Sequence, residues 1–221
     1  MVQSTIPTGS APKAPAPSRR GLFIGIAAAA VVLAAIALDT TVVHVGSEAD
    51  IRQQAFSPDG FGQAEFPRIQ EFVRQRAAEA SELAAAIEAD REAAIAQFGT
   101  PASTGAILAV RVTGVAGEPR AGIHPLAVEG LPEDITVRVQ TGPAINGTDL
   151  RDAPGDIEFG AFRNQIEYQN AGAGLNRAMK AAVLDPIDTA NLTGQTVEVV
   201  GAFRLINPQN WLITPVEVSV K

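Results

Sequence analysis

Two hydrophobic periods divide most of the chain. Between residues 63 and 98, apolar side chains recur every three or four positions, as in Phe66, Ile69 and Val73. This spacing is typical of helices that bury one face. From Gly105 onward the period is two, in segments such as ILAVRVTGVAG, ITVRVQTG and QTVEVVGAFRLI. Because alternate residues of a strand face opposite sides, the pattern predicts a helical part followed by a β-rich part.

Local signals divide the helical part further. Pro67 suits the first turn of a helix that begins near residue 63, and Ser81 is a candidate N-cap for the segment ELAAAIEAD. The next segment, REAAIAQF, ends before Gly99, a residue type that commonly follows a helix C-terminus. We expect a small helical subdomain over residues 63–100, the alternative being one long helix broken at Ser81.

The β-rich part contains at least five strand-like segments, at about residues 107–117, 126–131, 135–142, 195–206 and 211–220. Between the third and the fourth, Leu175, Met179 and Val183 have helical spacing, which predicts a helix crossing one end of the sheet. Five strands with one inserted helix predict a small barrel of the OB type over residues 101–221. Gly194 and Gly201 suit strongly curved strands, and Pro215 indicates an edge position or a bulge.

An uncharged apolar run, GLFIGIAAAAVVLAAIAL, occupies residues 21–38. As a helix, its eighteen residues would extend about 27 Å, close to the hydrocarbon thickness of a bilayer. Arg19 and Arg20 precede the run, so the positive-inside rule places residues 1–20, a basic tail of disordered composition, in the cytoplasm. We therefore expect a single-pass bacterial inner-membrane anchor with the C-terminal part in the periplasm.

Two alternatives to the anchor remain. Ala35-Ile36-Ala37 matches a small-x-small cleavage site, so the run could be a cleaved signal peptide, and it could also be a buried helix. After the run, residues 39–62 are expected to form a short strand and a linker. The expected fold class is thus α+β, with an N-terminal transmembrane helix, a helical subdomain and an OB-like barrel with a crossover helix.

Charge and composition exclude several classes of function. The chain has a formal charge of −7, and without the three cations of the tail the remainder holds 14 basic and 24 acidic residues, a charge of −10. This acidity disfavours nucleic acid and anionic lipid as partners, because phosphate binding depends on Lys and Arg. The absence of cysteine excludes disulfides, thiolate metal sites and a lipidated cysteine.

Catalytic and metal-binding patterns are weak. The two histidines are His44 and His124, the second expected in a turn beside Pro125, and they form neither a two-histidine metal motif nor a catalytic triad. No cofactor motif is apparent. Glycoside hydrolysis needs two opposed carboxylates, which Asp152, Asp156 and Glu158 could supply from an acidic loop. A glycoside-type hydrolase is therefore the alternative to a protein without enzymatic activity.

The stretch TGPAINGTDLRDA, residues 141–153, connects the third strand to the crossover helix and is rich in polar side chains. One interpretation is structural, because Asn-Gly favours turns and Asp and Thr side chains accept backbone N–H groups. Arg151, next to Asp149 and Asp152, favours an internal ion pair over an anion clamp. The other interpretation is a polar groove for a small hydroxylated ligand or a protein partner, lined by Asn146, Thr148, Asp149, Arg151, Asp152, Asn164, Gln165, Tyr168 and Asn170.

Three longer segments, QTGPAINGTDLRDA, GAFRNQIEYQNAGAGLNRAM and FRLINPQNWLITPVEV, resemble a bacterial family catalogued as domain of unknown function 2291, described as predicted periplasmic lipoproteins. The resemblance covers Leu38 to Lys221. It implies an exported, membrane-tethered protein with a helical part and an OB-like barrel, often encoded beside sugar transporters of the ATP-binding-cassette class. It implies no known activity. A small sugar and components of such a transporter are therefore the expected partners, beside the membrane itself.

The chain departs from the lipoprotein pattern at one position. Leu38 and Asp39 stand where a lipobox cysteine would follow the apolar run. We therefore expect no lipid attachment, and the N-terminal helix itself would have to serve as the tether.

Overall fold

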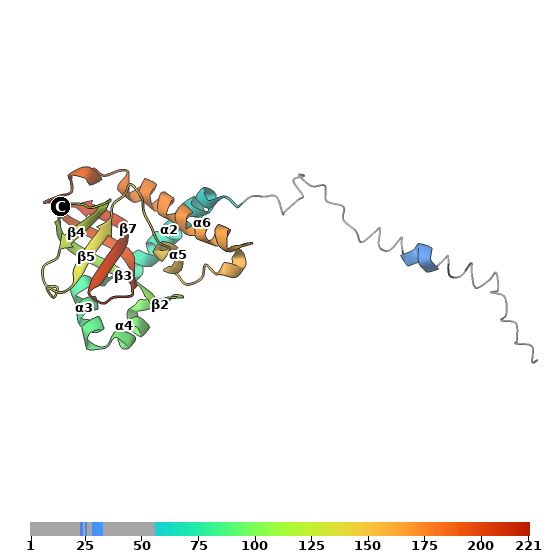
Figure 1. Ribbon diagram of the computed structural model, residues 1–221, viewed down its shortest axis with the longest axis horizontal. Coiled ribbons are helices and arrows are strands. Elements are labelled where there is room, and N and C mark those ends of the chain that lie inside the picture. Colours follow the sequence, from blue (N-terminus) through green and yellow to red (C-terminus); the bar gives the residue numbers. More distant parts are fainter. Residues whose placement is uncertain (1–22, 24, 26–27, 33–55) are drawn as a thin grey trace, which may run out of the picture. The chain divides into compact units, whose positions relative to one another are not determined.

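The computed structural model describes residues 23, 25, 28–32 and 56–221 (Figure 1). The expected tail over residues 1–20, most of the expected span over 21–38 and the expected strand before residue 56 lie outside the described residues. Residues 23, 25 and 28–32 are helical. Within the described part of the chain, no helix combines the length and the apolar content needed to cross a membrane. Residues 56–221 form one compact unit, and all that follows concerns this unit.

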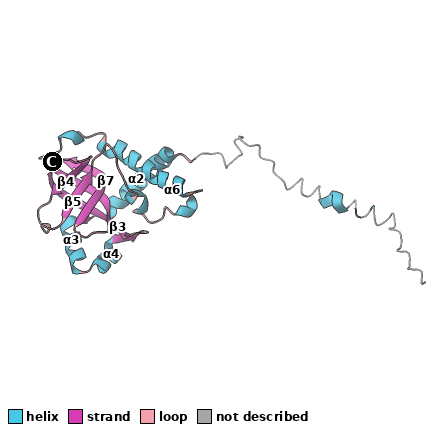
Figure 2. Cartoon of the chain, viewed as in Figure 1, coloured by secondary structure: helices cyan, strands magenta, loops and turns pink. Residues whose placement is uncertain are grey.

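Five strands close into a barrel: β3 (Ala106–Ala116), β4 (Ile123–Ala127), β5 (Thr136–Gln140), β6 (Thr196–Leu205) and β7 (Asn210–Val220). The order around the barrel is β3, β4, β5, β7, β6, and β6 pairs with β3 along ten residues to complete the closure. Figure 2 shows the strands gathered in magenta, with cyan helices around them. Among these five strands, only β5 and β7 pair in parallel. Two short strands, β1 (Ala78–Glu79) and β2 (Gly99–Pro101), add to the edge of β3. The expected OB-type barrel of five strands is confirmed.

The second strand lies earlier than the sequence predicts. The period-two pattern placed it at residues 126–131, but β4 covers Ile123–Ala127, so His124 and Pro125 lie in a strand and not in a turn. Pro125 is tolerated there because it is exposed and pairs with Arg138 of β5, while its carbonyl accepts a bond from the Gly117 amide. As a residue of β4, His124 is buried on the same face of the strand as Leu126.

A bulge bends the pair β6 and β7. The register shifts between Val200 and Gly201, where Gly201 faces Pro215. A Cβ on Gly201 would lie 2.5 Å from Ile213 Cγ2 and 2.6 Å from the Thr214 carbonyl oxygen, so only glycine fits. The expectations for Gly201 and Pro215 are thus confirmed, whereas Gly194 lies in the turn before β6 with φ of +81°.

The barrel interior forms the first core. Alternate residues of the strands point inward, among them Leu108 and Val110, and the buried rings of Phe203 and Trp211 stack with centroids 4.8 Å apart. Helix α3 (Ala80–Ala89) adds Leu83 and helix α4 (Arg91–Phe98) adds Ala94 to the same core. The hydrophobic period of these helices therefore serves the barrel and not a core of their own.

The second core lies on the opposite face of the barrel wall. Helix α2 (Pro58–Arg76) and helix α6 (Gln165–Met179), which continues as the π-helical segment η3 (Lys180–Leu184), pack on it side by side (Figure 1). Their buried residues include Ile69 and Leu175, which meet Ile107 of β3 and Val200 of β6. Strand β3 therefore buries both of its faces, which explains why ILAV reads as a continuous apolar run.

The ends of the helices agree only partly with the sequence signals. Helix α2 begins at Pro58, earlier than expected, because Ser57 caps it by accepting a bond from the Gly60 amide. Helix α3 begins at Ala80 with Glu79 as its N-cap, so Ser81 is inside the helix and the expected cap is wrong. Asp90 caps α4, which ends at Phe98, directly before Gly99 as predicted.

Candidate functional site

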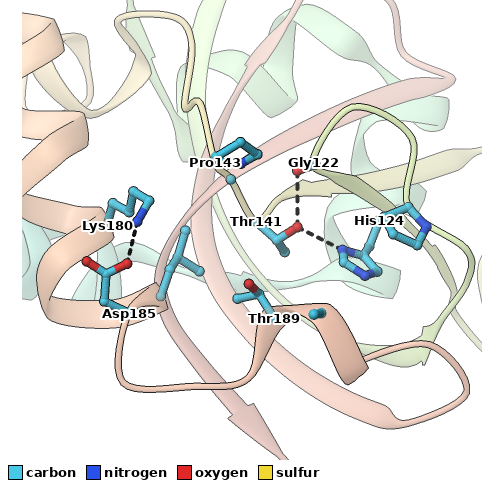
Figure 3. Close-up of a pocket in the computed structure, with 11 residues that line it drawn as sticks. Gly122, His124, Thr141, Pro143, Lys180, Asp185 and Thr189 are labelled. Carbon is cyan, nitrogen blue, oxygen red and sulfur yellow. Dashed lines mark hydrogen bonds and ion pairs between the residues drawn. The ribbon is translucent and has the colours of Figure 1, made fainter.

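A pocket of about 370 Å³ opens where strand β4 approaches the segment after helix α6 (Figure 3). Its walls come from the β3–β4 loop, the end of β5, the segment η3 and the 3-10 helix η4 (Thr189–Asn191). Small-molecule sites usually measure about 300 to 1,000 Å³. The residues that line the pocket are Pro119, Gly122, His124, Thr141, Gly142, Pro143, Lys180, Leu184, Asp185, Thr189 and Ala190.

His124 supplies the most unusual group of this pocket. The side chain is only 2% exposed, and its Nδ1 lies 2.7 Å from Thr141 Oγ1. Thr141 Oγ1 donates its single hydrogen to the Gly122 carbonyl oxygen, at 3.0 Å. The hydroxyl must therefore accept from Nδ1–H, which leaves Nε2 of the neutral ring as an acceptor.

The acceptor Nε2 has no hydrogen-bond partner in the described part of the chain, although it is buried. Figure 3 shows the imidazole beside Thr141, with its second nitrogen turned away from the hydroxyl. Burial lowers the pKa of His124, and the nearby Glu118 opposes this shift only in part. The ring is therefore neutral near pH 7. An unpaired buried acceptor costs about 1 to 3 kcal/mol, so a donor from a ligand or a water would be stabilised here.

An ion pair supplies the charged groups of the pocket. Lys180, at the start of η3, forms an ion pair with Asp185, the residue after its end, and Figure 3 shows the pair on one side of the pocket. Their side chains are 33% and 54% exposed, so the pair is accessible to solvent. Lys180 can donate hydrogen bonds, Asp185 can accept them, and the Thr189 hydroxyl can do both. The pocket thus offers mixed donors and acceptors without a strong net charge.

The backbone of the β3–β4 loop holds His124 in place. Gly122 has φ of +77°, and a Cβ there would overlap the Gly142 carbonyl oxygen, so this close approach requires glycine. The Thr141 amide donates to the Gly122 carbonyl at 2.8 Å, which ties the loop to the end of β5. The Thr141 hydroxyl therefore lies within reach of the imidazole.

The polar stretch after β5 is held by its own partners. Asp149–Asp152 form the short helix α5, in which Arg151 is 7% exposed and bonds Asp152 Oδ1 at 2.7 Å. The Thr148 hydroxyl donates to Asp152 Oδ2 at 2.8 Å. Arg204 of β6 reaches the same oxygen at 2.6 Å and Asp149 at 3.3 Å. The structure thus brings Thr148, Asp149, Arg151 and Asp152 together as an internal ion network, the arrangement that the sequence favoured for Arg151.

The pKa of one carboxylate in this network, Asp149, is set more by burial than by the attraction of Arg204. Burial raises the pKa of Asp149, Arg204 opposes the rise, and Asp152 adds to it. Removing Arg204 would therefore raise the pKa of Asp149 further.

The turn at Asn146 depends on buried amides elsewhere in the fold. The Gln140 side chain donates to the Asn146 carbonyl and accepts from the Asn146 amide, both at 2.9 Å. Asn176 of α6 donates to the Gly147 carbonyl at 2.9 Å. The Asn146 side chain itself is exposed and forms no hydrogen bond with the residues that the structure describes. Gln140 and Asn176 therefore anchor the loop, although neither residue is among the candidates that the sequence pattern suggested for this site.

The remaining predicted residues lie at the start of α6. Asn164 is the N-cap and accepts from the Glu167 amide at 2.9 Å, while Gln165 and Asn170 are exposed on the helix. Tyr168 is half-buried, and the Arg151 guanidinium lies 3.6 Å from the centre of its ring. Among the described residues, the contact of Arg151 with Tyr168 is thus the link between the two halves of the predicted groove, at α5 and at the start of α6.

An aromatic cluster surrounds Tyr168. Phe159 and Phe162 pack against its ring at centroid distances of 5.7 and 5.3 Å, and Phe162 continues the contact to Phe56 and Phe61. The tyrosine hydroxyl donates to the Ile157 carbonyl at 3.3 Å. Both the ring and the hydroxyl of Tyr168 therefore have partners within the fold.

The acidic loop does not present free paired carboxylates. Asp152 is bound by Arg151 and Arg204, and Asp156 forms an ion pair with Arg68 at 2.8 Å. Among the residues that the structure describes, no group of three or more His, Asp or Glu could hold a metal ion. The arginines hold two of the three carboxylates that the hydrolase alternative would use.

His124 and Arg204 are the main residues that sequence reasoning missed. His124 stood in a predicted turn, and nothing local showed that its second nitrogen would be buried. Arg204 alternates with apolar residues in β6, as any strand residue facing outward would. One signal could have identified His124: if the strand begins at residue 123, His124 and Leu126 face the same side of the sheet, and Leu126 is apolar.

No match is found among curated proteins. Among solved structures, the chain is similar to an OB-fold protein from Thermotoga maritima, with a TM-score of 0.59 and 15% sequence identity. The similarity covers 76% of this chain and all of that one. At this identity the likeness concerns the fold alone, and it agrees with the closed five-stranded barrel.

Residues 26–219 match the family described as predicted periplasmic lipoprotein, DUF2291, a range that begins twelve residues before the resemblance seen in the sequence. The description places the family in the periplasm and names no activity. The chain has no cysteine to carry a lipid. With nearly the whole chain matched, the protein belongs to the DUF2291 family of predicted periplasmic lipoproteins.

Proposed function

We propose that this periplasmic protein is a non-enzymatic accessory component that binds a small hydroxylated molecule, such as a sugar, in the His124 pocket. The observation that carries the proposal is the buried acceptor Nε2 of His124, which has no donor among the described residues. Nε2 is covered in this structure, so a small movement of the pocket wall would let a ligand hydroxyl donate to it. The exposed pair of Lys180 and Asp185 offers further hydrogen bonds at the same pocket.

The chemistry of the pocket favours a neutral polyol over an ion. Lys180 and Asp185 already neutralise each other, so a charged ligand would have to break their pair. A hydroxyl can donate to Nε2 and accept from Lys180, which suits a molecule with several adjacent hydroxyls. Pro143 and Leu184 line the pocket beside these groups and suit the apolar faces of a sugar ring.

The setting of the protein forms a second part of the proposal. The apolar run over residues 21–38 would tether the domain to the inner membrane, because its length suits a bilayer and Arg19 and Arg20 precede it. The family resemblance in the sequence supports association with a sugar uptake system of the ATP-binding-cassette class. The bound sugar and the transporter components would then be the partners of the domain.

Binding is tested by the melting temperature of the protein with pentoses, hexoses and polyols. A bound ligand stabilises the folded state by about 2.7 kcal/mol at a concentration of 100 Kd. We expect one class of sugar to raise the melting temperature, and His124→Leu and Asp185→Asn each to abolish the increase. Gln75→Leu, a similar change on the exposed face of α2, should leave the increase intact.

Three outcomes would contradict the binding proposal. No sugar or polyol raises the melting temperature, the His124 and Asp185 variants respond as the parent does, or the pure protein hydrolyses chromogenic glycosides without a partner. The last outcome would instead support the hydrolase that the acidic loop suggested.

The tether is tested by topology. A periplasm-specific reporter fused after Lys221 should be active, and changing Arg19 and Arg20 to Glu should weaken this orientation. A reporter active in the cytoplasm would refute the placement. Mature protein that begins at Leu38 would replace the anchor with a cleaved signal peptide and leave the compartment unchanged.

A further inference from the structure

A second pocket, of about 470 Å³, lies on the other face of strand β4. It is lined by Glu118, Arg120, Ile123, Pro125 and Arg138. Pro125 pairs directly with Arg138 of β5, and the backbone of Arg120 bonds to that of Ile123 across the loop. Because successive residues of a strand point to opposite faces, this pocket is separate from the one that contains His124.

Arg138 is held in place but not satisfied. Its Nη2 donates to Asn210 Oδ1 at 2.6 Å, which orients the guanidinium from the neighbouring strand β7. Its Nε is buried without a partner and lies out of reach of a ligand, whereas its Nη1 is accessible and has no hydrogen-bond partner in the described part of the chain. A fixed guanidinium with an unused donor is prepared for an acceptor that the protein itself does not supply.

The two arginines of this pocket also lack carboxylate partners. Most other cations of the domain form ion pairs, as Arg68 does with Asp156 and Arg111 with Glu198. Neither Arg120 nor Arg138 forms an ion pair with any residue that the structure describes. Residues 56–221 hold 13 basic and 21 acidic residues, a formal charge of −8, so unpaired cations that share one pocket form a local site for an anion.

We propose that this pocket binds a small organic carboxylate. A planar carboxylate matches the guanidinium of Arg138, with Arg120 adding attraction from the loop. Ile123 and Pro125 provide an apolar surface for the carbon skeleton, which a bare inorganic anion would not use. Glu118 lines the same pocket and repels the ligand, so it weakens the binding and restricts the pocket to ligands that hold their charge at Arg138.

The test is calorimetric titration of the full-length chain in detergent, at low salt, with succinate, inorganic phosphate and glucose. We expect succinate to bind, Arg138→Gln to weaken its binding at least tenfold and Arg120→Gln to weaken it by a smaller factor. Glu118→Gln should strengthen it two- to fivefold. Arg177→Gln, which removes an exposed arginine of α6, should change the affinity less than twofold.

The opposite responses of Arg138 and Glu118 separate a binding site from a general effect of charge or stability. Absence of succinate binding would overturn the proposal, as would phosphate binding of equal strength or an equal loss with Arg177→Gln. Succinate binding should also persist in His124→Leu, so the failure of one site is distinguishable from the failure of the other.

Discussion

Asp152 is the shared anion of the network that holds the loop after β5, and its replacement is the most informative single change. Its carboxylate bonds Arg151 and Arg204 at 2.7 and 2.6 Å and accepts from the Thr148 hydroxyl. Asp152→Ala would leave two arginines without their common partner. Arg204→Met, in contrast, leaves Asp152 bound to Arg151 and Thr148 and keeps an apolar chain of similar length.

The magnitudes follow from burial. The side chains of Arg151, Asp152 and Arg204 are 8%, 13% and 17% exposed, so solvent screens their interactions only in part. Removing one partner of a buried pair costs about 3 to 5 kcal/mol, and we expect about 3 kcal/mol for Asp152→Ala. For Arg204→Met we expect about 1.5 kcal/mol, because Asp149, whose pKa burial already raises, can take up a proton.

Urea denaturation of Asp152→Ala, Arg204→Met and the double variant measures these free energies of unfolding. The melting temperature should fall by roughly 2 to 4 °C per kcal/mol in a domain of this size. The double variant should lose less stability than the two single variants together, because with Met at position 204 the loss of Asp152 no longer leaves a second arginine without its carboxylate. If Asp152→Ala costs under 1 kcal/mol, or less than Arg204→Met, the network does not hold the loop and the reasoning fails.

Two further predictions concern the buried histidine and the helix contact. Because burial lowers the pKa of His124 below the unfolded value of about 6.5, the unfolded chain binds the extra proton, and stability should fall as pH drops below about 6.5. His124→Asn should flatten this part of the curve in pH-dependent denaturation, and an unchanged slope would contradict the assignment. A Cβ on Gly174 of α6 would overlap the Pro58 carbonyl oxygen of α2, so Gly174→Ala should lower the free energy of unfolding by about 2 kcal/mol or more. Gly160→Ala, where a Cβ meets nothing within 4 Å, should stay within about 0.5 kcal/mol, and equal losses in both would refute the packing argument.

Sequence periodicity determined the main elements of this fold because period and burial are coupled within each segment. The alternation in β6 and β7 and the spacing of Leu175, Met179 and Val183 follow from which face each element buries. Five strands with an inserted helix then left few closed arrangements, and the OB-type barrel was among them. The same reasoning failed for β4, since five residues containing a proline carry little periodic signal.

The polar chemistry was decided by tertiary structure, because its partners are distant in the sequence. The amino-acid sequence placed Arg151 beside Asp149 and Asp152, but only barrel closure brings Arg204 to Asp152 across 52 residues. His124 acquires its partner Thr141 and its unpaired nitrogen only when the β3–β4 loop meets the end of β5. A side chain's type is written in the sequence, whereas the groups that satisfy it, or leave it free to bind a ligand, depend on which segments the fold brings together.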